Sequence, residues 1–278
     1  MSENETKQIG QNIMKGKKGL VMGVANHHSI AWGIAKAAAD QGAELAFTYQ
    51  GQQFEKRVRP LAEEAGSDML IECDVSDEAN IDKAFEALTA KWSEIDFLVH
   101  AVAYSNKEEL KGKYVDTSLD NFLHTMHISC YSFTSLARRC KDIMPNGGSM
   151  LTLSYLGAER VMPCYNVMGV AKSALEASVR YLAEDLGEDA IRVNGISAGP
   201  MRTLAGSAIG NARQTFKYNV LSSPLRRSVD LEELGNSALY LLSDLSSAVT
   251  GEIHYVDCGF NIVGMPHHDN LKALASSA

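Results

Sequence analysis

The sequence predicts an α/β fold: a single-domain, Rossmann-type, doubly wound parallel sheet of about seven strands with helices on both faces. Short apolar runs rich in Val, Ile and Leu alternate with longer stretches of helical periodicity from residue 18 nearly to the end, which is the pattern of βαβ units. A chain of 278 residues with 45% hydrophobic content can bury a large core. Because no repeat or linker interrupts this alternation, we expect one domain over residues 1–278.

The expected elements follow one another in strict alternation. Each predicted strand is a short apolar run, and each predicted helix is a longer periodic stretch; Gly42, for example, follows the first helix as a natural stop. The strands are expected at 18–24, 43–49, 69–75, 95–103, 147–155, 190–197 and 251–258. The helices are expected at 30–41, 52–65, 77–91, 118–141, from about 164, and at 230–243. Outside them we expect an N-terminal extension at 1–16, a substrate-binding lid at about 199–228 and a loosely packed tail at about 265–278.

Composition excludes several classes of function. A formal net charge of -8 and a pI near 5.5 argue against nucleic acid or an anionic membrane as the main partner. Five cysteines show no CxxC and no paired Cys/His spacing, so we expect neither a disulfide framework nor a metal site. The sequence has no signal-peptide pattern at its start and no apolar run approaching ~18 residues. We therefore expect a cytoplasmic protein without an integral membrane segment.

A dinucleotide turn is predicted directly after the first strand, in "GVANHHSIAWG" at 23–33. A pyrophosphate needs backbone N–H groups at a helix N-terminus and no bulky side chain where the chains approach one another. Gly23 and Gly33 suit that need, Ser29 and Ile30 fill the middle of the fingerprint, and the Ser29 hydroxyl can add a hydrogen bond or cap the helix. A glycine pair that only makes a tight turn is the alternative.

The residues that would meet the adenosine follow the second and third strands. Gln50 stands where an acidic residue or an arginine often selects between NAD and NADP, and the first positive charges come only at Lys56 and Arg57. This favours NADH. Asp74 and Val75 offer the adenine a polar atom and an apolar wall, although Asp74 could equally cap the helix that begins near Ser76.

A tyrosine and a lysine stand seven positions apart in "YNVMGVAK", at Tyr165 and Lys172. In a helix, positions seven apart differ by about 20° around the axis, so both would lie on one face, and Tyr165 would lie roughly 4.5 Å further along than in a pair four apart. Such a phenol reaches an oxygen remote from the carbon that receives hydride, which suits conjugate reduction. We expect the ammonium to lower the pKa of the phenol from about 10. A packed tyrosine beside a solvated lysine is the alternative.

A family resemblance accompanies this spacing. The strings "LSYLGAERVMPCYNVMGVAK" (153–172), "ISAGPMRTLA" (196–205), "HHSIAWGIA" (27–35) and "FTYQ" (47–50) resemble the enoyl-[acyl-carrier-protein] reductases (NADH) of bacterial type II fatty acid synthesis, in the short-chain dehydrogenase/reductase superfamily. The resemblance runs from about residue 14 to 264. It implies NADH as cofactor, an acyl carrier protein with an enoyl thioester as partner, and a homotetramer packed through helices 118–141 and 164–187.

The resemblance also implies roles for individual residues. Tyr165 would stabilise the enolate or donate a proton, Lys172 would hold the cofactor ribose, and Tyr155 would line the acyl pocket. Ser105 would contact the substrate. The cofactor positions implied or supported by it are Gly23, Ser29, Ile30, Gln50, Asp74, Val75, Val102, Lys172, Met201, Arg202, Thr203, Leu204 and Ala205.

Other positions carry weaker signals. Ala103 stands where many relatives have glycine, which would narrow the pocket beside the nicotinamide. Asn121 is expected only to cap or solvate a helix start. His124 and His127 share a metal-like spacing without an evident third ligand, and His267 and His268 are expected to be solvated. A basic patch for the acidic carrier protein, or else a scattered solvated surface, is expected at Arg202, Arg213, Lys217, Arg226 and Arg227.

Two other functions fit parts of the pattern. A carbonyl or 3-oxoacyl thioester reductase on the same fold would also use a tyrosine and a lysine. A non-catalytic dinucleotide sensor would use the glycine turn alone, but the intact Tyr165 and Lys172 argue against it.

Overall fold

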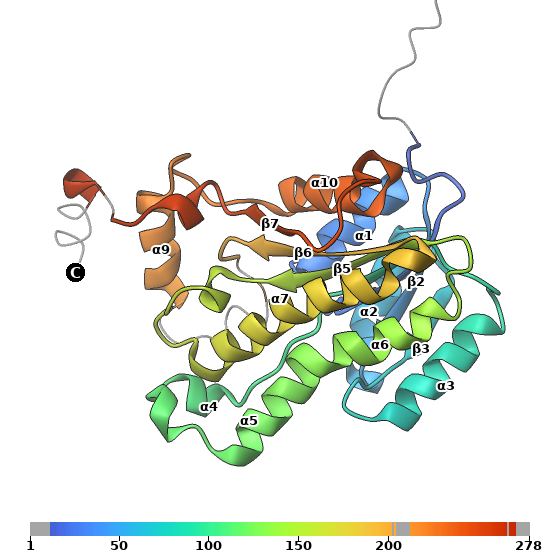
Figure 1. The fold of residues 1–278 in the computed structure, drawn as a ribbon, viewed down its shortest axis with the longest axis horizontal. Helices are drawn as coiled ribbons and strands as arrows, with labels where there is room; N and C mark the ends of the chain where they lie inside the picture. Colours follow the sequence, from blue (N-terminus) through green and yellow to red (C-terminus); the bar gives the residue numbers. More distant parts are fainter. Residues whose placement is uncertain (1–11, 202, 204–211, 266, 271–278) are drawn as a thin grey trace, which may run out of the picture.

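The computed structural model describes residues 12–201, 203, 212–265 and 267–270. Seven strands form one parallel sheet in the order β3-β2-β1-β4-β5-β6-β7 (Figure 1). They are β1 (Lys18–Met22), β2 (Glu44–Tyr49), β3 (Met69–Glu72), β4 (Phe97–His100), β5 (Gly148–Ser154), β6 (Ile191–Ala198) and β7 (Ile253–Val256). The predicted fold class is confirmed. Because the strand order reverses between β1 and β4, the carboxyl ends there open a crevice in which such sheets bind ligands.

Helices cover both faces of the sheet (Figure 1). One face packs against α1 (Ile30–Asp40), α2 (Gln52–Glu64) and α10 (Leu231–Leu242). The other packs against α3 (Glu78–Thr89), α6 (Ser132–Lys141) and α7 (Asn166–Leu186). The strands are consequently apolar on both sides, as parallel strands between two helix layers must be. Helices α4 (Lys107–Leu110) and α9 (Ala212–Ser222) lie toward the carboxyl ends of the strands.

The helix predicted over 118–141 is interrupted by one π-helical turn. Helix α5 covers Leu119–Met126, the π turn (η2) covers His127–Tyr131, and α6 continues from Ser132. Single π turns inside helices occur often at functional sites. Here the turn carries Ser129, whose Oγ accepts from the Tyr104 N–H and donates to the Tyr104 carbonyl, both at 3.0 Å. The π turn therefore fixes the loop that follows β4.

Several element boundaries differ from the prediction. The predicted strands 95–103 and 251–258 extend beyond both ends of β4 and β7. The expected extension over 1–16 is in part built into the domain: Met14 is fully buried and its N–H donates to the Gln41 carbonyl at 3.0 Å. Among the described residues, none of the helices is long and apolar enough to span a membrane.

Two glycines set how closely α1 and α10 pack. A Cβ on Gly33 would lie 2.8 Å from the Leu231 carbonyl oxygen, and one on Gly235 would lie 2.7 Å from the Gly33 carbonyl oxygen. Gly33 therefore allows the close packing of α1 against α10.

We predict that Gly235→Ala destabilises the protein, because the added methyl group overlaps backbone of α1 and forces the two helices apart. The expected loss in the free energy of unfolding is about 1–3 kcal/mol, measured by thermal or urea unfolding. Gly187→Ala is the control, since a Cβ there meets open space. Equal melting temperatures for the two variants would contradict the packing role of Gly235.

Candidate active site

Tyr165 lies at the N-cap of α7, not within it. The helix begins at Asn166, and the residues on both sides of Tyr165 have left-handed backbone, with φ of +59° at Cys164 and +42° at Asn166. The expected helical geometry of the Tyr165–Lys172 pair is therefore wrong, because the helical angle per residue does not apply across Asn166. Non-glycine residues in this conformation are uncommon, and they concentrate where surrounding structure holds them in place.

The side chain of Asn166 keeps this left-handed backbone in place. Its Nδ2 donates to the carbonyls of Glu109 at 3.1 Å, Leu110 at 3.3 Å and Gly112 at 2.9 Å. Asparagine tolerates left-handed backbone better than most residues, so Asn166 can adopt this conformation at low cost while its side chain makes these hydrogen bonds. The clamp joins the loop after β4 to the start of α7, directly beside Tyr165.

Apolar contacts complete the surroundings of Tyr165, which is 7% exposed. The ring of Tyr155 meets it edge-on with centroids 5.0 Å apart. A Cβ on Gly157 would lie 2.3 Å from Cδ1 of Tyr165, so the ring lies directly on the glycine backbone. The remaining members of this small cluster are Leu110, Phe122, Met162, Val167 and Met168. Tyr155 and Tyr165, which come from different segments, thus belong to one apolar cluster.

Burial controls the protonation of both tyrosines. It raises the pKa of Tyr165 far above its ordinary value, and the neighbouring Tyr155 and Glu176 act in the same direction. Burial, with Asp257, raises the pKa of Tyr155 to about 12. The expected lowering of the Tyr165 pKa by Lys172 is wrong, because desolvation of the hydroxyl dominates. Tyr165 is accordingly a neutral phenol, able to donate a hydrogen bond.

Lys172 is buried about 1.7 turns beyond the start of α7 at Asn166. It is 6% exposed, and its Nζ donates to the Leu153 carbonyl at 2.6 Å, which joins the helix to β5. Burial lowers the pKa of Lys172 to about 8, whereas Cys130 and Glu176 act to raise it. Lys172 is therefore mostly an ammonium at neutral pH. The alternative of a solvated lysine is excluded by this burial.

The glycine turn after β1 has the form that a dinucleotide requires. Gly23 has φ +99°, and a Cβ there would lie 2.1 Å from the Ala101 carbonyl oxygen, so the chains after β1 and β4 touch. Ser29 is the N-cap of α1, yet its Oγ accepts from the N–H groups of Ala25 at 3.0 Å and Asn26 at 3.2 Å. Its hydroxyl thus shapes the turn and does not cap the helix. Ile30 opens α1 and packs partly buried on the core.

The two polar residues assigned to the adenosine lie together. Gln50 Nε2 donates to Asp74 Oδ2 at 2.9 Å, across the ends of β2 and β3. The other oxygen of Asp74 accepts from the N–H of Ser76 at 2.9 Å and its hydroxyl at 2.7 Å. The cap of α3 is Asp77, so the alternative role of Asp74 as that cap is wrong. Val75 is buried beside this pair.

The remaining expected cofactor residues are described only in part. Val102 and Met201 lie partly buried against the two main core clusters. The Thr203 N–H donates to the Met201 carbonyl at 2.9 Å. Arg202, Leu204 and Ala205 lie outside the described residues.

Asn121 organises the loop that carries Ser105, contrary to the expectation that it only caps or solvates a helix. It is 6% exposed, and its Oδ1 accepts from the Asn106 N–H at 2.9 Å and the Ser105 hydroxyl at 3.3 Å. Thr125 Oγ1 donates to Ser105 Oγ at 2.9 Å. The position of Asn121 in the sequence was compatible with this role, because a polar residue at the third position of a helix can point into the protein and bind a neighbouring loop. Ala103, in the same loop, is exposed.

Two residues of the expected basic patch have partners within the chain. Arg227 forms an ion pair with Glu233 at the start of α10, and Arg226 Nη1 donates to the Leu221 carbonyl at 2.6 Å. Lys217 is exposed on α9, and Arg202 and the side chain of Arg213 are not described. The pairing of Arg227 removes its charge from any field that would attract an acidic partner.

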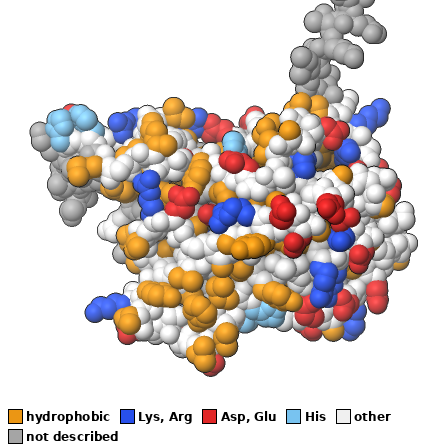
Figure 2. Space-filling view, viewed as in Figure 1, with side chains coloured by type: hydrophobic (Ala, Val, Ile, Leu, Met, Phe, Trp, Pro, Cys, Tyr) orange, Lys and Arg blue, Asp and Glu red, His pale blue; other side chains and the backbone are white. Residues whose placement is uncertain are grey.

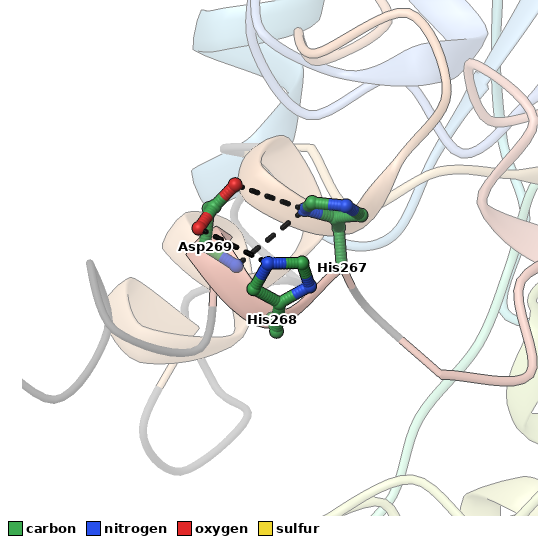
Figure 3. Close-up of side chains that lie close together, drawn as sticks. All are labelled: His267, His268 and Asp269. Atoms are coloured by element: carbon green, nitrogen blue, oxygen red, sulfur yellow. Dashed lines mark hydrogen bonds and ion pairs between the residues drawn. The ribbon is translucent and has the colours of Figure 1, made fainter.

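The two histidine pairs differ in their surroundings. His124 and His127 each contact an aromatic ring, of Tyr104 and Tyr131 respectively. His267 and His268 lie with Asp269 in an exposed group whose potential ligand atoms are within 4.8 Å of one another (Figure 3). The ring nitrogens of His267 and His268 lie 3.3 and 3.4 Å from the carboxylate oxygens of Asp269.

The described residues fit a nicotinamide dinucleotide along the crevice. A left-handed glycine removes side-chain bulk at the first turn, and a hydrogen-bonded Gln50–Asp74 pair stands at the adenosine end. The buried ammonium of Lys172 and the phenol of Tyr165 stand at the other end, on α7. Their order along the sheet edge is that of the two halves of a dinucleotide.

The chain is similar to known proteins over most of its length. Residues 23–261 match the family model described as "Enoyl-(Acyl carrier protein) reductase". It is 61% identical over 260 residues to "Enoyl-[acyl-carrier-protein] reductase [NADH] 2" of Rhizobium meliloti (strain 1021), covering 94% of this chain and 97% of that one.

Two solved structures share both fold and sequence with the chain. An Anaplasma phagocytophilum enoyl-(acyl-carrier-protein) reductase in complex with NAD matches with a TM-score of 0.88 and 56% identity, over 92% of this chain and 96% of that one. FabI from Candidatus Liberibacter asiaticus matches with a TM-score of 0.91 and 57% identity, over 92% and 100%.

We predict that Asn166→Asp loosens the clamp beside Tyr165. The carboxylate has the same shape but no N–H to donate, and it would face three carbonyl oxygens. The free energy of unfolding is expected to fall by about 1–3 kcal/mol, and proteases should cleave residues 107–113 faster. Asn236→Asp, at an exposed position of α10, is the control. An unchanged melting temperature and cleavage rate for Asn166→Asp would refute the clamp.

Proposed function

The chain belongs to the enoyl-(acyl carrier protein) reductase family, and we propose on this premise that it reduces the trans-2 double bond of enoyl-[acyl-carrier-protein] with NADH. The product is the saturated acyl thioester, at the last step of the fatty acid elongation cycle. One observation carries the assignment: a neutral, buried Tyr165 packs against Tyr155 at the N-cap of α7, the helix that carries the buried ammonium of Lys172.

The protein's part in the reaction is to stabilise negative charge on the substrate. NADH, when bound, supplies the hydride for the β-carbon. Tyr165 donates its O–H to the thioester carbonyl oxygen, where charge develops as the enolate forms, and such a donor in a dry site lowers a barrier by about 3–4 kcal/mol. Because the pKa of Tyr165 is raised, the phenol keeps its proton while negative charge develops on the enolate oxygen. Tyr155 closes the pocket around the acyl chain and excludes water.

The cofactor would be held along the crevice. Gly23, Ser29 and Ile30 would serve the pyrophosphate, and Lys172 the nicotinamide ribose. The Gln50–Asp74 pair carries the negative charge of Asp74, whose pKa is lowered by hydrogen bonds from Gln50 and Ser76, and it therefore suits the unphosphorylated ribose of NADH better than a 2′-phosphate. Val75 and Val102 would supply apolar walls for the rings. The segment Met201, Arg202, Thr203, Leu204 and Ala205 would meet the carboxamide and phosphates, as the family resemblance implies.

Assembly as a homotetramer is supported by an apolar surface. Hydrophobic side chains gather over α5 and the adjoining part of α7 (Figure 2). Leu119 is 69% exposed, Leu123 56% and Tyr181 76%. Large exposed apolar residues in one region mark protein interfaces. We propose that copies of the chain pack through α5–α6 and α7, and that the thioester arrives on an acyl carrier protein near Lys217.

A cytoplasmic location also belongs to this proposal. All five cysteines are free in the structure, and three of them, Cys73, Cys130 and Cys140, are buried. Buried thiols without disulfides suit a reducing compartment.

We predict that the protein oxidises NADH with crotonyl thioester and not with acetoacetyl thioester. Tyr165→Phe should lower kcat by about 10²–10³-fold, the cost of removing one donor to a developing oxyanion, while NADH still binds. The decrease of absorbance of NADH measures both rates. Tyr131→Phe, on the outer face of the η2 turn, is the matched control. Faster turnover of the oxo substrate would favour a carbonyl reductase instead.

We predict that NADH affinity falls as the pH rises through about 8. Burial places the Lys172 pKa at about 8, so the ammonium that would hold the ribose is present below that pH and lost above it. Because kcat/KM for NADH reports ionisations of the free enzyme, it should fall over the same interval. Fluorescence titration of NADH from pH 6 to 10 tests this. Affinity that stays constant to pH 10 would contradict it.

A further inference from the structure

Glu176 is a buried carboxylate for which the mechanism above has no role. It follows Lys172 by four residues on α7, so the two side chains are neighbours on one helix face. It is 6% exposed, as is Lys172. Ser154 Oγ donates to Glu176 Oε1. Since Ser154 ends β5 and directly precedes Tyr155, this hydrogen bond joins the strand that carries one active-site residue to the helix that carries another.

Lys172 needs a counter-charge. Its Nζ donates to the Leu153 carbonyl at 2.6 Å, and a carbonyl is a neutral acceptor. A buried ammonium without an opposite charge is costly, and it loses its proton instead. Glu176 lies near enough to act electrostatically on Lys172, and Lys172 acts on Glu176 in return. Buried charges persist when they are paired and hydrogen-bonded, and Ser154 supplies the additional hydrogen bond.

We propose that Glu176 is a positioning residue for the reduction: its carboxylate, fixed by Ser154, keeps Lys172 in the ammonium form that holds the cofactor. This inference rests on the proposed function, because it gives Lys172 that task. Glu176 acts through Lys172 and contacts neither the substrate nor the reacting atoms.

The other polar groups near the pair do not replace it. They come from every element packed there: His100 (β4), Cys130 (η2), Ser154 (β5), Glu159 (after η3), Tyr165 (before α7), Arg180 (α7) and Tyr255 (β7). Burial lowers the pKa of His100 to about 3 and raises that of the Cys130 thiol, so both are neutral. Glu159 and Arg180 are exposed and of opposite sign. Glu176 is thus, among the described residues, the buried carboxylate acting on Lys172, and the buried Cys130 thiol acts in the same direction.

The sign of the effect follows from these contacts. Burial lowers the pKa of Lys172 to about 8, and the charge of Glu176 opposes that change. Removing this charge must lower the pKa further, so Lys172 would lose its proton at a lower pH. Burial raises the pKa of Glu176 itself, and Glu159 acts in the same direction, whereas the Ser154 hydrogen bond, Arg180 and Lys172 act to lower it and so favour the carboxylate.

The test is the pH profile of Glu176→Gln, which keeps the size of the side chain and an oxygen to accept from Ser154. The pH at which NADH affinity and kcat/KM fall should decrease by about one unit, the low end of the effect of an opposite charge ~4–6 Å away. Below pH 6 the variant should match the wild type. A properly folded Glu176→Gln with the wild-type profile overturns the proposal.

Three further variants sharpen the test. Glu176→Met removes the charge with an apolar side chain of similar size, and it should show the same shift if the glutamine variant does not fold. Glu176→Asp keeps the charge and should keep the wild-type profile; a shift as large as that of the neutral variants would overturn the proposal. Glu184→Gln, at an exposed site on α7, should shift nothing.

The two proposals fail in different ways. If the wild type reduces no enoyl thioester at any pH, the proposed function fails. If the wild type is active but the neutral variants at Glu176 show the same pH profile as the wild type, the positioning role fails and the proposed function stands. NADH binding, measured by fluorescence without substrate, supports or overturns that role independently of turnover.

Discussion

Burial of one positive charge beneath α7 is the constraint on which the site depends. Lys172 is withdrawn from water, which is tolerable only if the surrounding protein replaces its hydration. The Leu153 carbonyl supplies a hydrogen bond at 2.6 Å, and this acceptor is available because Leu153 lies near the end of β5. Helix α7 must therefore lie close to the C-terminal end of β5. This hydrogen bond between Lys172 and Leu153 fixes α7 relative to the end of β5, at the edge of the crevice.

The same requirement explains the strained entry into α7. Once Lys172 is fixed against β5, the chain before it must turn sharply to place Tyr165 in the pocket. Left-handed backbone at Cys164 and Asn166 makes that turn, and the amide of Asn166 offsets its cost by binding three carbonyls of the loop after β4. Ser129 fixes the start of that loop, and Asn121 the middle. Two strand-end loops thus form one rigid wall around the phenol.

Sequence reasoning succeeded where the signal is local and periodic. The alternation of apolar runs with helical stretches gave the seven strands, because parallel strands between two helix layers must be apolar on both sides. It could not show that Tyr165 precedes its helix, since the helical pattern continues through Asn166. It also gave the wrong direction for the Tyr165 pKa, because a neighbouring ammonium can be read from spacing but the depth of burial cannot. Asn121 and Glu176 look like surface residues in the sequence and are buried only by tertiary packing.

Lys172 and Tyr165 differ in protonation state and therefore have different tasks. Lys172 retains a positive charge, and the task proposed for Glu176 is to keep that charge in a buried site. Tyr165 remains a neutral donor whose hydrogen bond is strongest when the substrate oxygen is most negative. An interaction that strengthens as the enolate forms lowers the barrier, whereas one equally strong in the ground state would only tighten binding. A phenolate at Tyr165 would repel that oxygen. Burial of Tyr165, which costs stability, is what keeps it a neutral hydrogen-bond donor.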